Sequence, residues 1–428
     1  MRIKSSRNNR SAMLLIASAL LVVVLGFVRF YNGGSGSVQI PEIERKTELE
    51  PIQITIKEKH YLKLKKKRNQ ALADGILETN DNDYIPGIIT FNGEEYDADL
   101  RLKGDWTDHL NGDKWSYRIK LKNDRTILGM RKFSLHHPKT RGYINEWLYH
   151  KANKFEKLIG LRYYFVEGFL HIKMKGRNNF INKEVGIYAI EETFDKRTIE
   201  SNKRKIGVIL RISEKYFWKE VKQAWQIGAQ TGYSPRPKRR PNFSGPWNEY
   251  ITTFGVSNIM QDKLLGPQFV HAKNLLEEYR SYNLKVSEVF DSKKLAMYTA
   301  LNNLFCAYHG LEAINLRFYY NPTTSKFEPI AYDGNSGYKL KQFHHYLYSK
   351  RNMDSEYRKE LIKALEYVSK PEYLDRLFSL FYKEARGLET QLRPEFGKAA
   401  LILKQNYAHN QTILRQELKN LKDEATKN

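Results

Sequence analysis

The residues best suited to chemistry lie in the segment 309–338, which contains two β-rich runs joined by the turn 321–324. Asp333 follows the second run, in a loop rich in Gly, Asn and Ser, and Asn315 precedes the first run. If the two runs pair as a hairpin, Asn315 and Asp333 come close together. Mg²⁺ is usually held by one or two carboxylates together with substrate phosphates. The segment therefore predicts a magnesium site formed by Asp333, Asn315 and Asn335, although these residue types also make ordinary turns.

Basic residues follow one face of two neighbouring predicted strands. Arg101 and Lys103 lie two residues apart on the first strand, and Arg118 and Lys120 lie two apart on the second. The dipeptide Asn92-Gly93, just before the first of these strands, is a strong hairpin signal. Because side chains two residues apart on a strand share a face, these strands present a basic face. Such a face suits either solvent or the phosphates of a ligand.

One principal helix interrupts the strands. It is predicted over Arg141–Leu158 and carries Glu146, and later strands include one that ends at Glu191-Glu192. Residues 50–212 are therefore predicted to form a mostly antiparallel sheet with one inserted helix. A Pro- and Arg-rich linker follows, and the remaining pattern is largely helical. The expected organisation is an anchor at 1–31, a linker at 32–49, a β-rich part at 50–230, a linker at 231–247, and a helical part at 248–428 with the metal-site hairpin 315–337.

Composition limits the classes of partner. The 428 residues include 72 basic and 48 acidic side chains, a net charge of +24, which predicts attraction to polyanions of unspecified kind. No zinc-finger spacing, RNA-binding aromatic motif or basic zipper is present, so the sequence does not favour nucleic acid. The single cysteine, Cys306, excludes an internal disulfide and a multi-cysteine metal site. The pair His136-His137 is interpreted as structural, since adjacent strand residues point to opposite faces.

The N-terminus reads as a membrane anchor. Ser11–Val28 carries no charge over 18 residues and follows several basic residues, which favours a spanning helix with its N-terminus in the cytoplasm. A cleaved signal peptide is the alternative. In both cases the main part of the chain is expected outside the cytoplasm. The basic stretch 57–68 is read either as a solvated helix face or as a contact with anionic lipid.

Three stretches resemble blocks of the spore-coat CotH family of atypical protein-kinase-like proteins. Asp99–Leu121, DLRLKGDWTDHLNGDKWSYRIKL, is similar to the family's "RxKGxS … KxSYRxKL" block. Glu184–Phe194, EVGIYAIEETF, is similar to its "GxYxxxE" block. Asn315–Gly337, NLRFYYNPTTSKFEPIAYDGNSG, is similar to its "NxxLYxxPxTGKxxxIPxDxDxxxG" block and is the most specific of the three. Together the blocks span roughly residues 50–340.

The resemblance implies an α+β, two-lobed protein-kinase-like fold, with an antiparallel-sheet N-lobe, a helical C-lobe and one transmembrane helix before them. It also implies binding of ATP and Mg²⁺ and phosphorylation of Ser or Thr on secreted or cell-envelope proteins. In such an arrangement Glu146 would pair with Lys103 or Lys120 to hold the phosphates. The nucleotide would also contact the hinge Glu191-Glu192 and the basic Arg101 and Arg118. Asp333, Asn315 and Asn335 would hold the metal.

The chain departs from the family pattern at two positions. Asn335 replaces the second Asp of Asp-x-Asp, and no Asp stands where the family often has its catalytic base. His309 is the candidate for that role, because an imidazole can accept a hydroxyl proton near neutral pH. These departures support an alternative, a non-catalytic surface or envelope protein that binds acidic polymers or proteins. A third hypothesis is a metal-dependent transferase acting on an anionic surface polymer.

Overall fold

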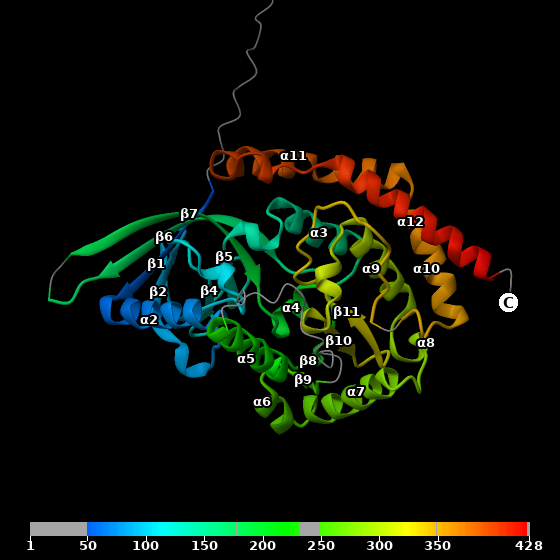
Figure 1. Ribbon diagram of the computed structural model, residues 1–428, viewed down its shortest axis with the longest axis horizontal. Coiled ribbons are helices and arrows are strands. Elements are labelled where there is room, and N and C mark those ends of the chain that lie inside the picture. The colour runs from blue at the N-terminus through cyan, green and yellow to red at the C-terminus, as the bar shows by residue number, and fades with distance from the viewer. Residues whose placement is uncertain (1–48, 177–178, 232–248, 348, 426–428) are drawn as a thin grey trace, which may run out of the picture. The chain divides into compact units, whose positions relative to one another are not determined.

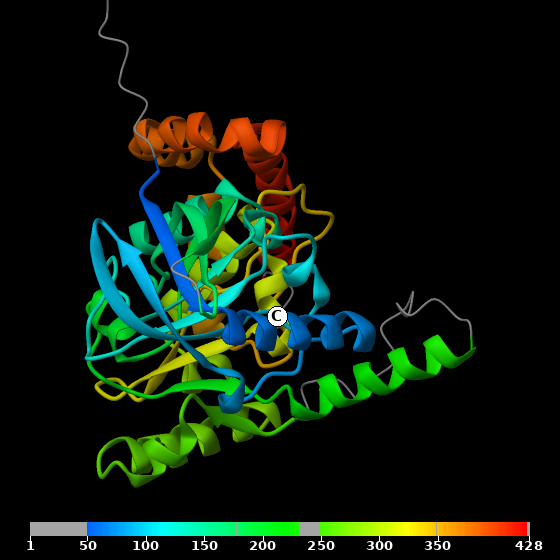
Figure 2. The ribbon, with the colours of Figure 1, turned by 90° about the vertical axis from the view of Figure 1, so that its left-hand side faces the viewer.

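A computed structural model describes residues 49–176, 179–231, 249–347 and 349–425 (Figures 1 and 2). The predicted anchor, and the Pro- and Arg-rich linker apart from its first residue, lie outside these ranges, so those predictions stay predictions. Within the described ranges, no helix combines the length and the apolar character that crossing a bilayer requires.

The first half of the described chain forms a closed seven-stranded barrel. Its strand order is β1-β2-β3-β4-β5-β7-β6, antiparallel throughout except where β1 pairs in parallel with β6. The predicted hairpin at Asn92-Gly93 is confirmed, since it joins β2 to β3 and both residues have positive φ, 51° and 75°. The strands are β1 (Pro51–Lys57), β2 (Ile85–Phe91), β3 (Glu94–Leu102), β4 (Tyr117–Leu121), β5 (Lys132–His136), β6 (Tyr163–Lys173) and β7 (Phe180–Glu192).

Strict alternation of apolar and polar residues explains the barrel. In β4 the apolar residues at every second position are buried, and the residues between them are only partly buried. The helix α2 (Glu58–Asp74) adds Leu64 and Ala71 to the same apolar core. The barrel interior is therefore a packed hydrocarbon core that leaves the intervening residues on its outer face.

A second, four-stranded sheet lies among the helices. Its order is β11-β10-β8-β9, formed by β8 (Ile209–Ile212), β9 (Ile251–Thr253), β10 (Arg317–Asn321) and β11 (Lys326–Pro329). The predicted hairpin around the turn 321–324 is confirmed, because β10 and β11 pair antiparallel with Phe318 opposite Pro329. Asp333 therefore stands just beyond the end of β11.

Helices cover this second sheet and share the largest apolar core with it. The helix α3 (Ile144–Phe155) packs on β6 and on α9 (Ser292–Leu304), and the predicted principal helix is thereby confirmed. The remaining helices are α4 (Lys196–Ser201), α5 (Lys215–Thr231), α6 (Val256–Gln261), α7 (Leu265–Arg280), α8 (Val286–Val289), α10 (Ser355–Val368), α11 (Pro371–Phe396) and α12 (Lys404–Ala425).

The α+β class is confirmed, but the expectation of a two-lobed protein-kinase-like fold is wrong. The predicted open N-lobe sheet is a closed barrel, because β1 returns to pair with β6. The strand β8, expected in the first sheet, pairs instead with β10 and β9. Alternation along a strand indicates which side chains face inward, but it does not show which distant strands pair. The closure of the barrel could therefore not be predicted from the sequence.

Candidate functional site

A row of polar residues crosses the outer face of the barrel. The register places Arg101 opposite Arg118, Arg118 opposite Ser134, and Ser134 opposite Glu191. Tyr163 lies opposite Glu191 on the next strand. Residues directly opposite each other project from the same face of a sheet, so these five form one line. The prediction that Arg101 and Arg118 lie on a common basic face is confirmed.

A buried ion pair anchors this row. Lys103 Nζ lies 2.9 Å from Glu191 Oε2, and both side chains are almost completely buried. Burial lowers the pKa of Lys103 to about 8, although Glu191 opposes that shift. Burial alone would raise the pKa of Glu191, but Lys103 and Arg141 hold it well below its usual range. The pair is therefore ionised at neutral pH.

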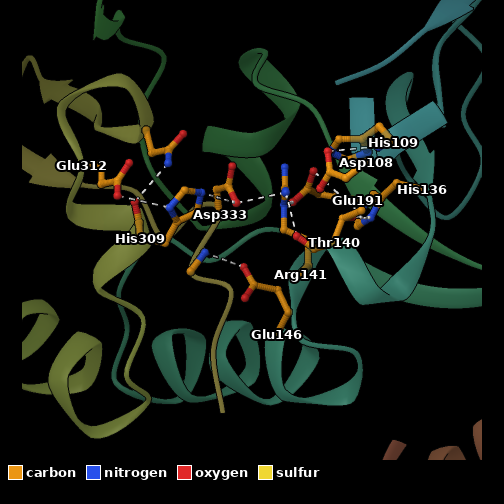
Figure 3. Close-up of polar contacts among 12 residues, drawn as sticks. Asp108, His109, His136, Thr140, Arg141, Glu146, Glu191, His309, Glu312 and Asp333 are labelled. Carbon is orange, nitrogen blue, oxygen red and sulfur yellow. Dashed lines mark hydrogen bonds and ion pairs between the residues drawn. The ribbon is translucent and has the colours of Figure 1, made fainter. Parts of the chain in front are cut away.

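Arg141 bridges the barrel and the Asp333 loop. Its Nη1 lies 3.0 Å from Asp333 Oδ1 and its Nε lies 3.6 Å from Glu191 Oε1 (Figure 3). Burial opposes the charged guanidinium, but Asp333 and Glu191 raise the pKa of Arg141 well above its ordinary value. A Cβ on the next residue, Gly142 (φ 74°), would lie 2.4 Å from Ser336 O. Glycine thus lets the two loops approach closely enough for Arg141 to reach Asp333.

The loop after β11 is strained and fixed in place. Asp333 and Asn335 both have left-handed backbones, with φ of 52° and 47°, a conformation that costs energy in non-glycine residues. The Glu146 carboxylate accepts a 2.9 Å hydrogen bond from Gly334 N and one of 3.3 Å from the hydroxyl of Ser336. The first turn of α3 therefore holds the Asp333 loop in its position.

The predicted pairing of Glu146 with a sheet lysine does not form. Glu146 faces the 334–336 loop, whereas Lys103 is committed to Glu191. Lys120 lies over the ring of Tyr84, with its Nζ 4.5 Å from the ring centroid. Lys103 pairs with Glu191 instead of Glu146 because β3 and β7 bring Lys103 and Glu191 together. This contact depends on the tertiary structure alone.

Glu146 and its neighbour His150 are neutral at ordinary pH. Burial raises the pKa of Glu146 to about 8, although the Gly334 N–H and Arg141 oppose the shift. Burial also lowers the pKa of His150 to about 3. His150 Nδ1 accepts a hydrogen bond from Leu161 N, so the ring proton sits on Nε2, which lies 3.7 Å from Glu146 Oε1.

Two of the predicted site residues, His309 and Asn315, lie on the other side of Asp333. His309 Nε2 lies 3.6 Å from Asp333 Oδ1, and its Nδ1 lies 3.6 Å from Glu312 Oε1 (Figure 3). Asn315 donates a 3.0 Å hydrogen bond from its amide to His309 O. Burial would lower the pKa of His309, but Asp333 and Glu312 raise it above its ordinary value. The imidazole is an ion-pair partner of Asp333 in this state.

The other predicted residues are less closely connected to Asp333. Glu192 accepts a hydrogen bond from Arg162 N and forms an ion pair with the Arg162 guanidinium, which also donates to Gly129 O. These contacts secure the beginning of β6 to the end of β7. Asn335 is half-buried in the strained loop two residues beyond Asp333.

Asp105 is the site residue that the sequence reading missed. It follows β3. Its side chain is exposed to solvent, although many protein atoms lie around its carboxyl group. That surrounding protein, Glu214 and Asp333 raise its pKa to about 6, while Arg118 and Arg101 oppose the shift. Asp105 and Asp333 are therefore near enough to repel each other, beside two guanidinium groups. The sequence signal was available, since Gly104-Asp105 directly follows the basic strand.

Several buried polar atoms behind this cluster make no hydrogen bond within the described protein. His136, also missed as a site residue, is fully buried, bonds Thr140 through Nδ1 at 2.9 Å, and lies 3.9 Å from Glu191 through Nε2. Each of these atoms is buried, and some of them belong to the ion pairs of Arg141 with Glu191 and Asp333. The atoms without hydrogen bonds are Ser134 Oγ, His136 Nε2, Arg141 Nε, His150 Nε2, Tyr163 OH, Glu191 Oε1 and Asp333 Oδ1.

The arrangement suits an anionic ligand accompanied by a cation. Among the described residues, no group of three or more His, Cys, Asp or Glu side chains is arranged to hold a metal. A magnesium ion would need substrate oxygens to complete its coordination, which is how Mg²⁺ is commonly bound.

No protein-family model matches the chain, and no curated protein is significantly similar to it. The CotH resemblance therefore stays a prediction based on three short blocks.

Proposed function

We propose that the protein is an ATP- and Mg²⁺-dependent phosphotransferase that acts on Ser or Thr hydroxyls of secreted or envelope proteins. The observation that carries the proposal is that Asp333 forms ion pairs with Arg141 and His309, while Arg141 also contacts Glu191, in the row of the barrel face that carries Arg101 and Arg118. Phosphoryl transfer depends on positioning and charge neutralisation, and this cluster offers groups for both.

The carboxylates fit a magnesium ion. Asp333 contributes to the raised pKa of Asp105, so a divalent cation held near both carboxylates would relieve that repulsion. Asp333 Oδ1 is buried and is paired with Arg141 and His309. Asp333 would hold the ion, and Asp105 would add negative charge to the site. Asn315 is linked to Asp333 through His309. The ion would neutralise charge on the transferred phosphoryl group.

The guanidinium groups fit the phosphates. Arg101 and Arg118 project from the same face of adjacent strands and are partly exposed. Guanidinium groups bind phosphate through two parallel hydrogen bonds, and such charge-assisted bonds are stronger than neutral ones. Lys103, unlike the two arginines, is not assigned to the phosphates. Its ion pair with Glu191 joins the end of β3, which carries Arg101, to β7, and through Arg141 this pair is linked to Asp333.

The reaction forms a bond between the acceptor hydroxyl oxygen and the γ-phosphorus and breaks the bond to the β–γ bridging oxygen, so that ADP leaves. In its neutral form His309 would accept the hydroxyl proton, and its Nε2 lies 3.6 Å from Asp333. The ring is partly exposed, so an acceptor side chain can reach it.

One observation favours the non-catalytic alternative. Arg141 already forms a 3.0 Å ion pair with Asp333, so a cation must compete with a guanidinium for that carboxylate. A protein that binds acidic polymers or proteins without transferring phosphate would keep this pair intact and use Arg101 and Arg118 alone.

Transfer of labelled γ-phosphate separates the two functions. Three proteins are compared: the wild-type full chain, Asp333→Asn and the matched control Asp99→Asn. Each is incubated with Mg·ATP and with envelope proteins from the cells that produce this protein. Asp99 lies on the same strand as Arg101, in an exposed pair with Lys122. We expect acceptor labelling by the wild type and the control, and at least a 100-fold loss in Asp333→Asn. Equal labelling by Asp333→Asn, or none by any form, contradicts the proposal.

A further inference from the structure

One end of the barrel carries a basic surface that the proposed function does not use. Here the described part of the β6–β7 hairpin tip, residues 172–176 and 179–181, lies beside the start of α2, and Figure 1 shows the hairpin and α2 extending to the same side. Lys57, the last residue of β1, pairs with Lys173 near the end of β6. Lys175 N donates a 3.1 Å hydrogen bond to Glu58 Oε2 in the first turn of α2. The hairpin tip and α2 are thus joined into one surface.

Lysines dominate this surface. On α2, Lys59, Leu62, Lys63 and Lys66 follow the spacing of a single helix face, and all four are exposed. The lysine charges also act on a neighbouring group, since burial together with Lys59, Lys57 and Lys63 lowers the pKa of His60. Acidic groups offset only part of this charge, for example Asp83, which pairs with Lys67 at 3.1 Å. The exposed lysines of this surface are Lys57, Lys59, Lys63, Lys65, Lys66, Lys173 and Lys175.

Apolar side chains project from the same surface. Phe180 and Ile181 begin β7 and are 45% and 44% exposed, and Leu62 on α2 is 53% exposed. Phe180 lies opposite Lys173, and Ile181 lies opposite Ile172. Neighbouring strand residues point to opposite faces, so the tip presents apolar groups on both sides.

We propose that this surface, the hairpin tip of β6 and β7 with the first turns of α2, docks onto an anionic lipid bilayer. Lysines supply attraction to acidic headgroups, and Phe180, Ile181 and Leu62 bury their side chains at the boundary with the acyl chains. A dissolved polyanion would use the lysines but gain nothing from the three apolar groups. The mixture of exposed apolar and basic residues therefore favours a bilayer.

Docking would also set the height of the candidate site. The strand β6 runs through eleven residues from Tyr163, in the row beside Glu191, to Lys173 at the docking surface. At about 3.3 Å per residue, the site would stand roughly 30 Å from the headgroups. An acceptor protein of the envelope could then reach His309 and Asp333 above the lipid surface.

An environment-sensitive fluorophore tests this surface in the full chain. Cys306 is the native cysteine of the chain and is buried, so the label can be placed selectively on Ile181→Cys. The matched control carries the label on Tyr382→Cys, at a 65% exposed position on α11. We expect a blue shift at position 181 in vesicles that contain phosphatidylglycerol, none in vesicles of phosphatidylcholine alone, and none at position 382 in either.

Charge variants complete the test. Replacing Lys59, Lys66 and Lys175 by Gln in the Ile181→Cys protein should weaken docking roughly 100-fold, about fivefold per lysine. Raised salt should act in the same direction, because it screens the attraction. A label at position 181 that stays in water in phosphatidylglycerol vesicles overturns the proposal. So does a shift that persists in phosphatidylcholine, or attraction to anionic vesicles without any shift, which would indicate charge alone.

Discussion

The two faces of the barrel wall are built from the same strands but carry different kinds of side chain. Inward-facing side chains are almost wholly buried hydrocarbon, and they need no partner beyond one another. Outward-facing side chains on β3, β4, β5 and β7 are charged or polar, and several of their buried atoms make no hydrogen bond in the described protein. The inside therefore forms an apolar core, whereas the outside carries buried polar groups and ion pairs. Inward examples are Leu100, Ile119, Phe133 and Ile190; outward examples are Arg101, Arg118, Ser134 and Glu191.

The largest effect is expected from breaking the outer ion pair. Glu191→Ala leaves Lys103 and Arg141 buried without their common carboxylate, which should lower the free energy of unfolding by about 3–5 kcal/mol. Urea denaturation measures it. The matched control is Asp99→Ala, which removes an exposed pair with Lys122 and should cost under about 1 kcal/mol. Equal costs for the two variants would show that burial of the outer pair has no energetic consequence.

Glu146 should make stability depend on pH. Its pKa is about 8 in the folded protein and near 4.5 when unfolded, so the unfolded chain loses this proton first as pH rises. The folded state is thereby destabilised progressively between about pH 4.5 and pH 8. Glu146→Gln keeps an oxygen that can accept the hydrogen bond from Gly334 N, but its side chain does not titrate. The free energy of unfolding of this variant, compared with that of the wild type, should therefore rise by a few kcal/mol between pH 4.5 and pH 8.

The curves of unfolding free energy against pH for wild type and Glu146→Gln should separate through this interval. Parallel curves would mean that Glu146 is ionised in the folded protein, and the neutral pairing with His150 would be wrong.

A change on the outer face should affect binding rather than folding. Arg118→Met removes a guanidinium that we assign to the phosphates, at a cost of about 1.5–3 kcal/mol, or roughly 10- to 100-fold in nucleotide affinity. The side chain is partly exposed, so the melting temperature should change little. Fluorescence titration with a labelled ATP analogue measures the affinity. An unchanged affinity would remove Arg118 from the phosphate site.

The smallest effect is expected at the neighbouring inward position. Ile119→Val deletes one methyl group from the barrel core and should cost about 0.5–1.5 kcal/mol of stability. Nucleotide affinity should stay the same, because the side chain points away from the site. A loss of affinity in Ile119→Val without a loss of stability would break the division between the two faces.

Local signals explain what the sequence predicted correctly. The hairpin β10–β11 follows from its turn residues, and the shared face of Arg101 and Arg118 follows from strand alternation. Both predictions depend on residues close together in the chain or on the two-residue period of a strand, so they need no knowledge of the tertiary structure.

Contacts between distant segments explain what the sequence could not predict. Lys103 and Glu191 are 88 residues apart, and nothing local distinguishes Glu191 from Glu146 as the partner of a sheet lysine. The parallel pairing of β1 with β6 closes the barrel across a similar separation. Asp105 directly follows the basic strand in the sequence, but the influence of Glu214 and Asp333, which raise its pKa, depends on the tertiary structure.

Calorimetric titration of the full chain with ATP, with and without Mg²⁺, tests the central claim most directly. We predict Mg²⁺-dependent binding that is at least 100-fold weaker in Asp333→Asn and in Asp105→Asn, and unchanged in Asp99→Asn. Absence of ATP binding with any divalent cation, or binding that both carboxylate variants retain, would contradict it.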